Sequence, residues 1–104
     1  MGEEENRIQK QILEYLLALG LSAWRNNTAG IKKGSRFIRC GIKGSADIIA
    51  ILPPNGRFLG IEVKVPGKKQ SDDQIDWQAE VEAAGGLYLL AENLEDVVEG
   101  RCSL

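Results

Sequence analysis

The chain has 104 residues, a net charge of -2 and a hydrophobic share of 43%, the composition of one globular domain covering residues 1–104. Because it contains no histidine, Ser-His-Asp catalysis, Cys-His catalysis and histidine metal sites are excluded. No apolar stretch approaches the roughly 18 residues that span a bilayer, so we expect no membrane partner. A cytoplasmic location is expected because a reducing compartment suits two unpaired cysteines. Cys40 and Cys102 lack metal-ligand spacing and are expected to be free thiols.

The N-terminal half predicts one helix followed by short extended segments. Apolar residues recur at helical spacing from residue 8 to residue 19, which indicates an amphipathic helix over residues 3–19 that ends at Gly20. Residues 21–25 form a strand candidate, and a polar loop over residues 26–30 is expected to follow it. Residues 35–40 are expected to be another strand or an extended edge.

A hairpin is predicted over residues 47–65, with residues 53–56 (Pro-Pro-Asn-Gly) as its turn. If these four residues form the loop, Leu52 faces Arg57, and counting back places Asp47 directly opposite Glu62. Opposed residues of an antiparallel pair share a face of the sheet. Lys64 lies two residues beyond Glu62 and is therefore expected on that same face.

Both faces of this hairpin are largely apolar, so helices are expected to cover the sheet on both sides. Ser71 and Gln74 form a predicted capping box that begins a helix ending near Ala84. A buried strand over residues 87–91 and a short closing helix near residues 94–98 complete the chain. This order predicts an α/β fold with a mixed central sheet flanked by helices.

The predicted meeting of Asp47, Glu62 and Lys64 suits phosphodiester hydrolysis. Two carboxylates on adjacent strands can hold one Mg²⁺ or Mn²⁺, since both ions prefer oxygen ligands. Lys64 would then orient a water nucleophile or stabilise negative charge on the phosphate. The same three residues could instead form a buried ion-pair network with no catalytic role.

Basic residues are concentrated between residues 15 and 46, a segment without any acidic residue. They form either a solvated basic loop or a surface that contacts phosphates beside the carboxylates. The residues are Arg25, Lys32, Lys33, Arg36, Arg39 and Lys43.

The motifs Gly44-Ser45-Ala46-Asp47, Glu62-Val63-Lys64 and Ser71-Asp72-Asp73-Gln74 resemble the Asp…Glu-x-Lys…Gln signature of the PD-(D/E)XK nuclease superfamily. Within that superfamily the chain resembles the virus-type replication-repair nuclease (VRR-NUC) domain more closely, and the hallmarks of that domain also include Trp24-Arg25-Asn26-Asn27-Thr28 and Ala84-Gly85-Gly86. The resemblance implies a restriction-endonuclease-like αβββαβ core. The family often has proline where Asp72 stands, and both residues suit the start of a helix.

The resemblance also implies functional roles. Asp47, Glu62 and the carbonyl of Val63 would bind Mg²⁺ or Mn²⁺, Lys64 would be the catalytic lysine, and Gln74 would support the site. A glutamate of the first helix would join it; Glu5 fits best, Glu4 competes with it, and a solvated helix start is the alternative.

The resemblance implies DNA as the partner, with contacts expected from Asn27 and the six basic residues above. We expect a structure-selective endonuclease for branched DNA (a four-way junction or a flap), acting as a homodimer in a bacterial or phage-infected cell. The alternative is a non-catalytic DNA-binding module that retains the nuclease fold.

Overall fold

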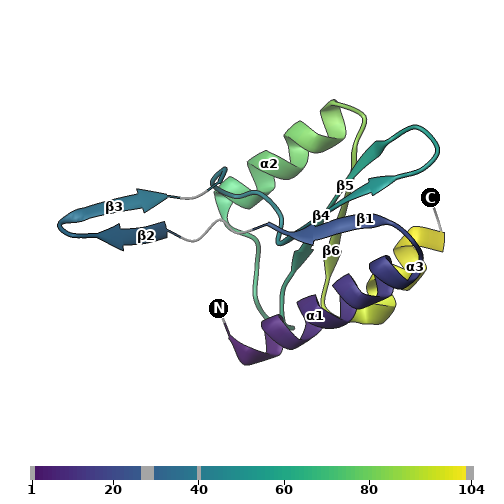
Figure 1. Cartoon of the computed structure of the whole chain (residues 1–104), viewed down its shortest axis with the longest axis horizontal. Helices are drawn as coiled ribbons and strands as arrows, with labels where there is room; N and C mark the ends of the chain where they lie inside the picture. Colours follow the sequence, from purple (N-terminus) through teal and green to yellow (C-terminus); the bar gives the residue numbers. More distant parts are fainter. Residues whose placement is uncertain (1, 27–29, 40, 103–104) are drawn as a thin grey trace.

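The computed structural model describes residues 2–26, 30–39 and 41–102, which contain three helices and six strands (Figure 1). None of the helices in these ranges is long and apolar enough to cross a membrane. In chain order the elements are α1 (Glu3–Ala18), β1 (Ser22–Arg25), β2 (Gly30–Lys33), β3 (Arg36–Arg39), β4 (Ile48–Leu52), β5 (Arg57–Val63), α2 (Asp72–Ala83), β6 (Leu87–Ala91) and α3 (Leu94–Cys102).

The main sheet has four strands in the order β1-β4-β5-β6. Strand β4 is antiparallel to β1 and β5, whereas β5 and β6 are parallel. Parallel neighbours need a crossover connection, and α2 provides it. The sheet is therefore mixed, and α1, β1, β4, β5, α2 and β6 follow the expected αβββαβ order.

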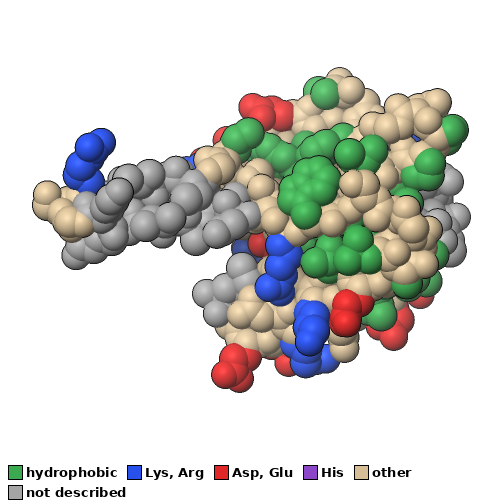
Figure 2. Space-filling model, viewed as in Figure 1, with side chains coloured by type: hydrophobic (Ala, Val, Ile, Leu, Met, Phe, Trp, Pro, Cys, Tyr) green, Lys and Arg blue, Asp and Glu red, His purple; other side chains and the backbone are tan. Residues whose placement is uncertain are grey.

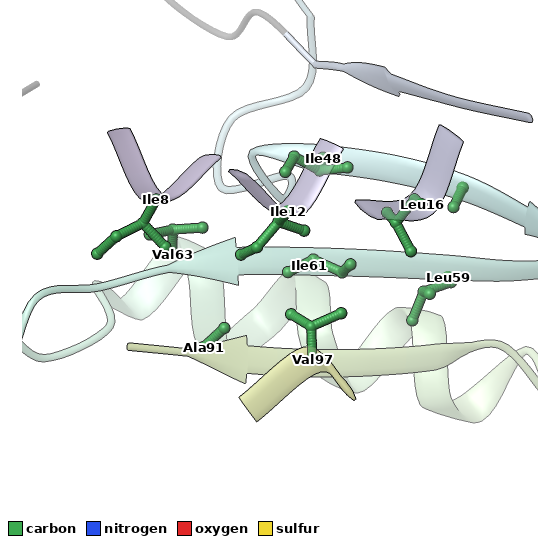
Figure 3. Close-up of a cluster of buried hydrophobic side chains, with 10 residues drawn as sticks. Ile8, Ile12, Leu16, Ile48, Leu59, Ile61, Val63, Ala91 and Val97 are labelled. Atoms are coloured by element: carbon green, nitrogen blue, oxygen red, sulfur yellow. The ribbon is translucent and has the colours of Figure 1, made fainter. Parts of the chain in front are cut away.

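One face of the sheet packs against α1 and α3 (Figure 3). The buried apolar positions of α1 are spaced four residues apart and meet the inward positions of β4 and β5, as the hydrophobic pattern predicts. Their removal from water supplies the main stabilisation of the domain. This cluster consists of Ile8, Ile12, Leu16, Ile48, Ala50, Leu59, Ile61, Val63, Ala91 and Val97.

The opposite face packs against α2 through a smaller cluster built around Trp77. Gly60 allows this approach, because a Cβ atom at that position would lie 2.9 Å from the Trp77 ring. The expectation that this whole face is buried is wrong. Ile51 and Phe58 are 41% and 37% exposed, although the Phe58 ring centroid lies 5.8 Å from that of Trp77, so α2 covers this end of the hairpin only in part.

Residues 30–39 form an antiparallel hairpin that makes its own two-stranded sheet, β2–β3. The predicted loop over residues 26–30 is wrong at Gly30, and the basic segment from Lys32 to Arg36 includes strand residues as well as a turn. Gly34 has a φ of +63° and precedes Ser35 in a two-residue turn. Glycine at the first turn position is typical of type II′ hairpins, so the Gly-Ser pair carries a signal for this hairpin.

Gly44 lets the segment before β4 pack tightly onto the start of α2. Its φ is +84°, and a Cβ atom there would lie 2.3 Å from the carbonyl oxygen of Asp73. Neither the backbone conformation nor the contact accommodates a side chain. Gly44 therefore fixes the position of the neighbouring Asp47 relative to α2.

We expect Gly44→Ala to lower the free energy of unfolding by about 3 kcal/mol, because strain at positive φ adds to overpacking against backbone atoms. Gly67→Ala is the matched control, since Gly67 has a φ of +91° and open space around its Cβ position. The control should lose only about 1 kcal/mol. Denaturant unfolding of both variants measures the difference, and equal losses would contradict the proposed contact.

Candidate active site

Asp47 and Glu62 lie next to each other at one end of the β4–β5 pair. Ile48 pairs with Ile61, so the preceding Asp47 lies across from Glu62. The Val63 N–H donates a hydrogen bond of 2.8 Å to Oδ2 of Asp47. The register counted from the turn is confirmed, because Leu52 pairs with Arg57.

Glu62 is buried, with 3% of its surface exposed. Its Oε2 accepts a hydrogen bond of 3.0 Å from the Gln74 side-chain amide. Its Oε1 is also buried, but among the described residues it has no hydrogen-bond partner. An unsatisfied carboxylate oxygen is costly in the protein interior, so this atom requires a proton or a cation.

The pKa values of both carboxyl groups are raised. Burial is the largest cause for Glu62, followed by the charge of Asp47, and together they raise the pKa of Glu62 from 4.5 to about 8. Burial also raises the pKa of Asp47, although the hydrogen bond from Val63 opposes the shift. The interaction between the two carboxyl groups acts on them in opposite directions, raising the pKa of Glu62 and lowering that of Asp47.

Gln74 connects the first turn of α2 to Glu62. The side-chain oxygen of Gln74 accepts a hydrogen bond of 2.8 Å from the backbone N–H of Ser71. The backbone N–H of Gln74 donates to the Ser71 hydroxyl at 3.2 Å. The predicted capping box is thus present. The side-chain NH₂ group of Gln74 takes no part in the capping box, and this group donates to Glu62.

Lys64 and Glu5 lie near the carboxyl pair and act on it with opposite charges. The charge of Lys64 lowers the pKa of Asp47 and Glu62, whereas the charge of Glu5 raises the pKa of both. Lys64 follows the end of β5 rather than lying within it, and its N–H donates to the carbonyl of Ala91 at 2.9 Å.

Glu5 and Glu4, the two candidates for the glutamate of the first helix, differ in their surroundings. Glu5 is half-buried, while Glu4 is exposed and pairs with Arg7. Over residues 2–26, 30–39 and 41–102, no three acidic or cysteine side chains group closely enough to hold a metal ion. Glu5 therefore influences the pair through its charge and does not make a third close ligand in this conformation.

Asn26 and Ser45 position the segment that carries Asp47, a role that the sequence analysis did not assign. The Asn26 side chain donates to the Ser45 hydroxyl at 2.8 Å and to the Ala46 carbonyl at 3.0 Å. Its backbone N–H donates to the Asp47 carbonyl at 2.8 Å. The signal was available, since Asn26 and Ser45 both lie within the motifs quoted for the family.

The candidate DNA-contacting residues have varied surroundings. Arg25 donates to the Asn6 carbonyl at 2.9 Å, and Lys43 forms an exposed ion pair of 3.0 Å with Asp73. Arg36 is exposed at the start of β3. Asn27 lies outside the described residues, as do the side chains of Lys32, Lys33 and Arg39.

Comparison with known proteins identifies the family. The model of the VRR-NUC domain matches residues 3–92. The chain belongs to this family. A solved structure described as a VRR_NUC domain is 22% identical and superimposes with a TM-score of 0.69 over 94% of each chain, which shows the shared fold. No curated protein matches the chain. The VRR-NUC assignment gives this protein a nuclease fold and confirms the family resemblance read from the motifs.

The raised pKa of Glu62 predicts how the stability of the metal-free protein depends on pH. The unfolded chain releases this proton near pH 4.5, whereas the folded protein retains it up to about pH 8. The folded state binds more protons between these values, so the free energy of unfolding falls as pH rises through the window, by up to about 1.4 kcal/mol per unit.

Glu62→Gln should remove this dependence, and its melting temperature should increasingly exceed that of the wild type from pH 5 to pH 8. The control is Glu80→Gln, which removes an exposed carboxylate from α2. Thermal melts in a chelator measure both variants. If Glu62→Gln follows the wild type at every pH, the carboxyl group is not held in the environment described.

Proposed function

We propose that this VRR-NUC domain is a Mg²⁺- or Mn²⁺-dependent endonuclease that hydrolyses phosphodiester bonds in branched DNA. The observation that carries the proposal is the pairing of half-buried Asp47 with buried Glu62, whose Oε1 has no hydrogen-bond partner among the described residues. A lysine charge acts on the same pair. A purely structural ion-pair network would be expected to satisfy its buried oxygens, and Glu62 Oε1 is unsatisfied among the described residues.

The residues present fit a hard divalent cation. Asp47 and Glu62 supply carboxylate oxygens, and the Val63 carbonyl and the more distant Glu5 would add further oxygen ligands. When bound, the cation supplies charge neutralisation at the phosphate and a more acidic water. It would also relieve the repulsion that raises the pKa of Glu62.

The other residues of the site hold these groups in place. The Val63 N–H fixes one oxygen of Asp47, and the Gln74 amide fixes one oxygen of Glu62. Each carboxylate therefore has a defined orientation before any ligand arrives, which lowers the cost of assembling the site. We assign Lys64 the role of stabilising negative charge on the phosphate or orienting the nucleophilic water.

Asp47→Asn and Lys64→Met should each reduce Mn²⁺-dependent cleavage of a labelled four-way junction or flap by about 10²- to 10³-fold. Lys10→Met, an exposed lysine of α1, removes the same charge and should retain wild-type cleavage. Single-turnover cleavage measures all three variants.

Purified protein that leaves every branched substrate intact in Mn²⁺ would overturn the enzyme proposal. If that protein still binds DNA, and Lys64→Met leaves the binding unchanged, the chain is instead a non-catalytic DNA-binding module.

We further propose a homodimer, since a domain of this size presents one active site and cutting both strands of a four-way junction usually takes two. An exposed apolar patch supports this idea. Trp24, Ile51 and Phe58 share the sheet face that carries the carboxyl pair, and they are 45%, 41% and 37% exposed. Figure 2 shows hydrophobic side chains gathered on the viewed face of the main body. Exposed apolar patches are typical of protein interfaces.

Trp24→Glu should therefore convert a dimer into a monomer, because it places a charge in the apolar patch. Leu17→Glu is the control, since Leu17 is 51% exposed on α1. Sedimentation velocity at matched concentrations distinguishes the two variants. A wild type that sediments as a monomer, with or without DNA, would contradict the dimer.

A further inference from the structure

The β2–β3 hairpin, hereafter the arm (residues 30–39), stands apart from the rest of the molecule. It forms a separate sheet and projects along the longest axis of the protein, which measures 46 Å against 30 Å and 26 Å for the others (Figure 1). In the described parts of the chain, β2 and β3 pack chiefly against each other. An isolated two-stranded hairpin is only marginally stable in water, so a partner outside the domain would be expected to stabilise it.

The net charge of the arm is opposite in sign to that of the rest of the chain, hereafter the body. The arm contains four basic residues and no acidic residue: Lys32, Lys33, Arg36 and Arg39. The whole chain has a net charge of -2, so the residues outside the arm carry a net charge of -6. An acidic body repels a polyanion, and the arm supplies the positive potential needed to attract one.

The backbone register of the arm places two of these basic residues at opposed positions. Lys33 and Arg36 are Cα partners across the turn. Like charges at opposed positions destabilise a strand pair, and a neighbouring anion relieves the repulsion. Arg36 is exposed, and Figure 2 shows a basic side chain near the free end of the arm.

The base of the arm is fixed beside the candidate active site. The chain leaves β1 at Asn26, which hydrogen-bonds to Ser45 and Ala46 on the returning segment and to the carbonyl of Asp47. The returning segment is held against α2 by Gly44 and by the Lys43–Asp73 ion pair. The arm thus projects from the end of the sheet that carries the two carboxyl groups.

Taking the nuclease function proposed above as its basis, we infer that the arm contacts the phosphate backbone of duplex DNA that flanks the cleavage site. A strand of four residues spans roughly 13 Å, which matches about four base-pair steps of a duplex. The contacts expected from lysine and arginine at this distance are with phosphates, so they are independent of sequence. The arm therefore supplies affinity and orientation, while chemistry stays with the carboxyl pair.

The test uses the full chain and a fluorescein-labelled duplex of about 20 base pairs, with a chelator present to prevent cleavage. Fluorescence anisotropy gives the dissociation constant at several salt concentrations between roughly 50 and 200 mM. Each lost phosphate contact lowers the magnitude of the slope of log K against log salt by about one. The double variant Lys33→Gln/Arg36→Gln should therefore lower it by about two and bind more weakly at every salt concentration.

The matched control is Arg57→Gln, which changes the first residue of β5 at the opposite end of that strand from Glu62. Its salt slope should equal that of the wild type. Thermal melts of both variants check that the body is folded. A folding defect would weaken binding without lowering the slope of log K against log salt by the number of charges removed.

An unchanged slope in the arm variant, or an equal change in the control, would overturn the inference. So would a wild type that binds no duplex at the lowest salt concentration. If the arm variant dissociates a dimer and leaves DNA binding unchanged, the arm contacts the acidic body of a second copy and the inference is wrong. Because binding is measured without cleavage, an inactive enzyme would contradict the proposed function and leave this result standing.

Discussion

The placement of Asp47 opposite the buried Glu62 is the constraint on which the rest of the site depends. The hairpin register places the two residues opposite each other, and the burial of Glu62 limits the water that would screen their charges. The arrangement is unfavourable for the metal-free protein when both groups are ionised, as the raised pKa of Glu62 indicates. Carboxyl groups with strongly raised pKa values are typical of functional sites, where a bound ligand offsets the repulsion between them.

Gln74 shows how one residue serves both folding and the site. Its oxygen completes the capping box of α2, and its amide nitrogen donates to Glu62. Glutamate would serve equally well in the capping box, but it would bring a third negative charge to the carboxyl pair. Glutamine keeps the helix start and offers a donor instead. The position of α2 is therefore coupled to the orientation of Glu62.

Sequence reasoning was most successful where short-range rules determine the structure. The turn before Arg57 predicted the hairpin register, and the Ser71–Gln74 spacing identified the capping box.

Sequence reasoning failed where packing between distant elements decides the outcome. The exposure of Ile51 and Phe58 depends on where α2 lies across the sheet, and no local pattern reports that position. Strand β2 was missed because its sequence, Gly-Ile-Lys-Lys, has one apolar side chain and no alternating pattern. The bridging role of Asn26 depends on a contact with Ser45 nineteen positions away.

The most direct test of this account is calorimetric titration of the protein with Mn²⁺ at pH 7, repeated in two buffers with different ionisation enthalpies. Glu62 holds a proton at this pH and must release it to bind a cation, so about one proton should be released per ion bound. Glu62→Gln should abolish that release. Heats that are independent of the buffer, or an absence of Mn²⁺ binding, would contradict the claim that this carboxyl pair is a cation site.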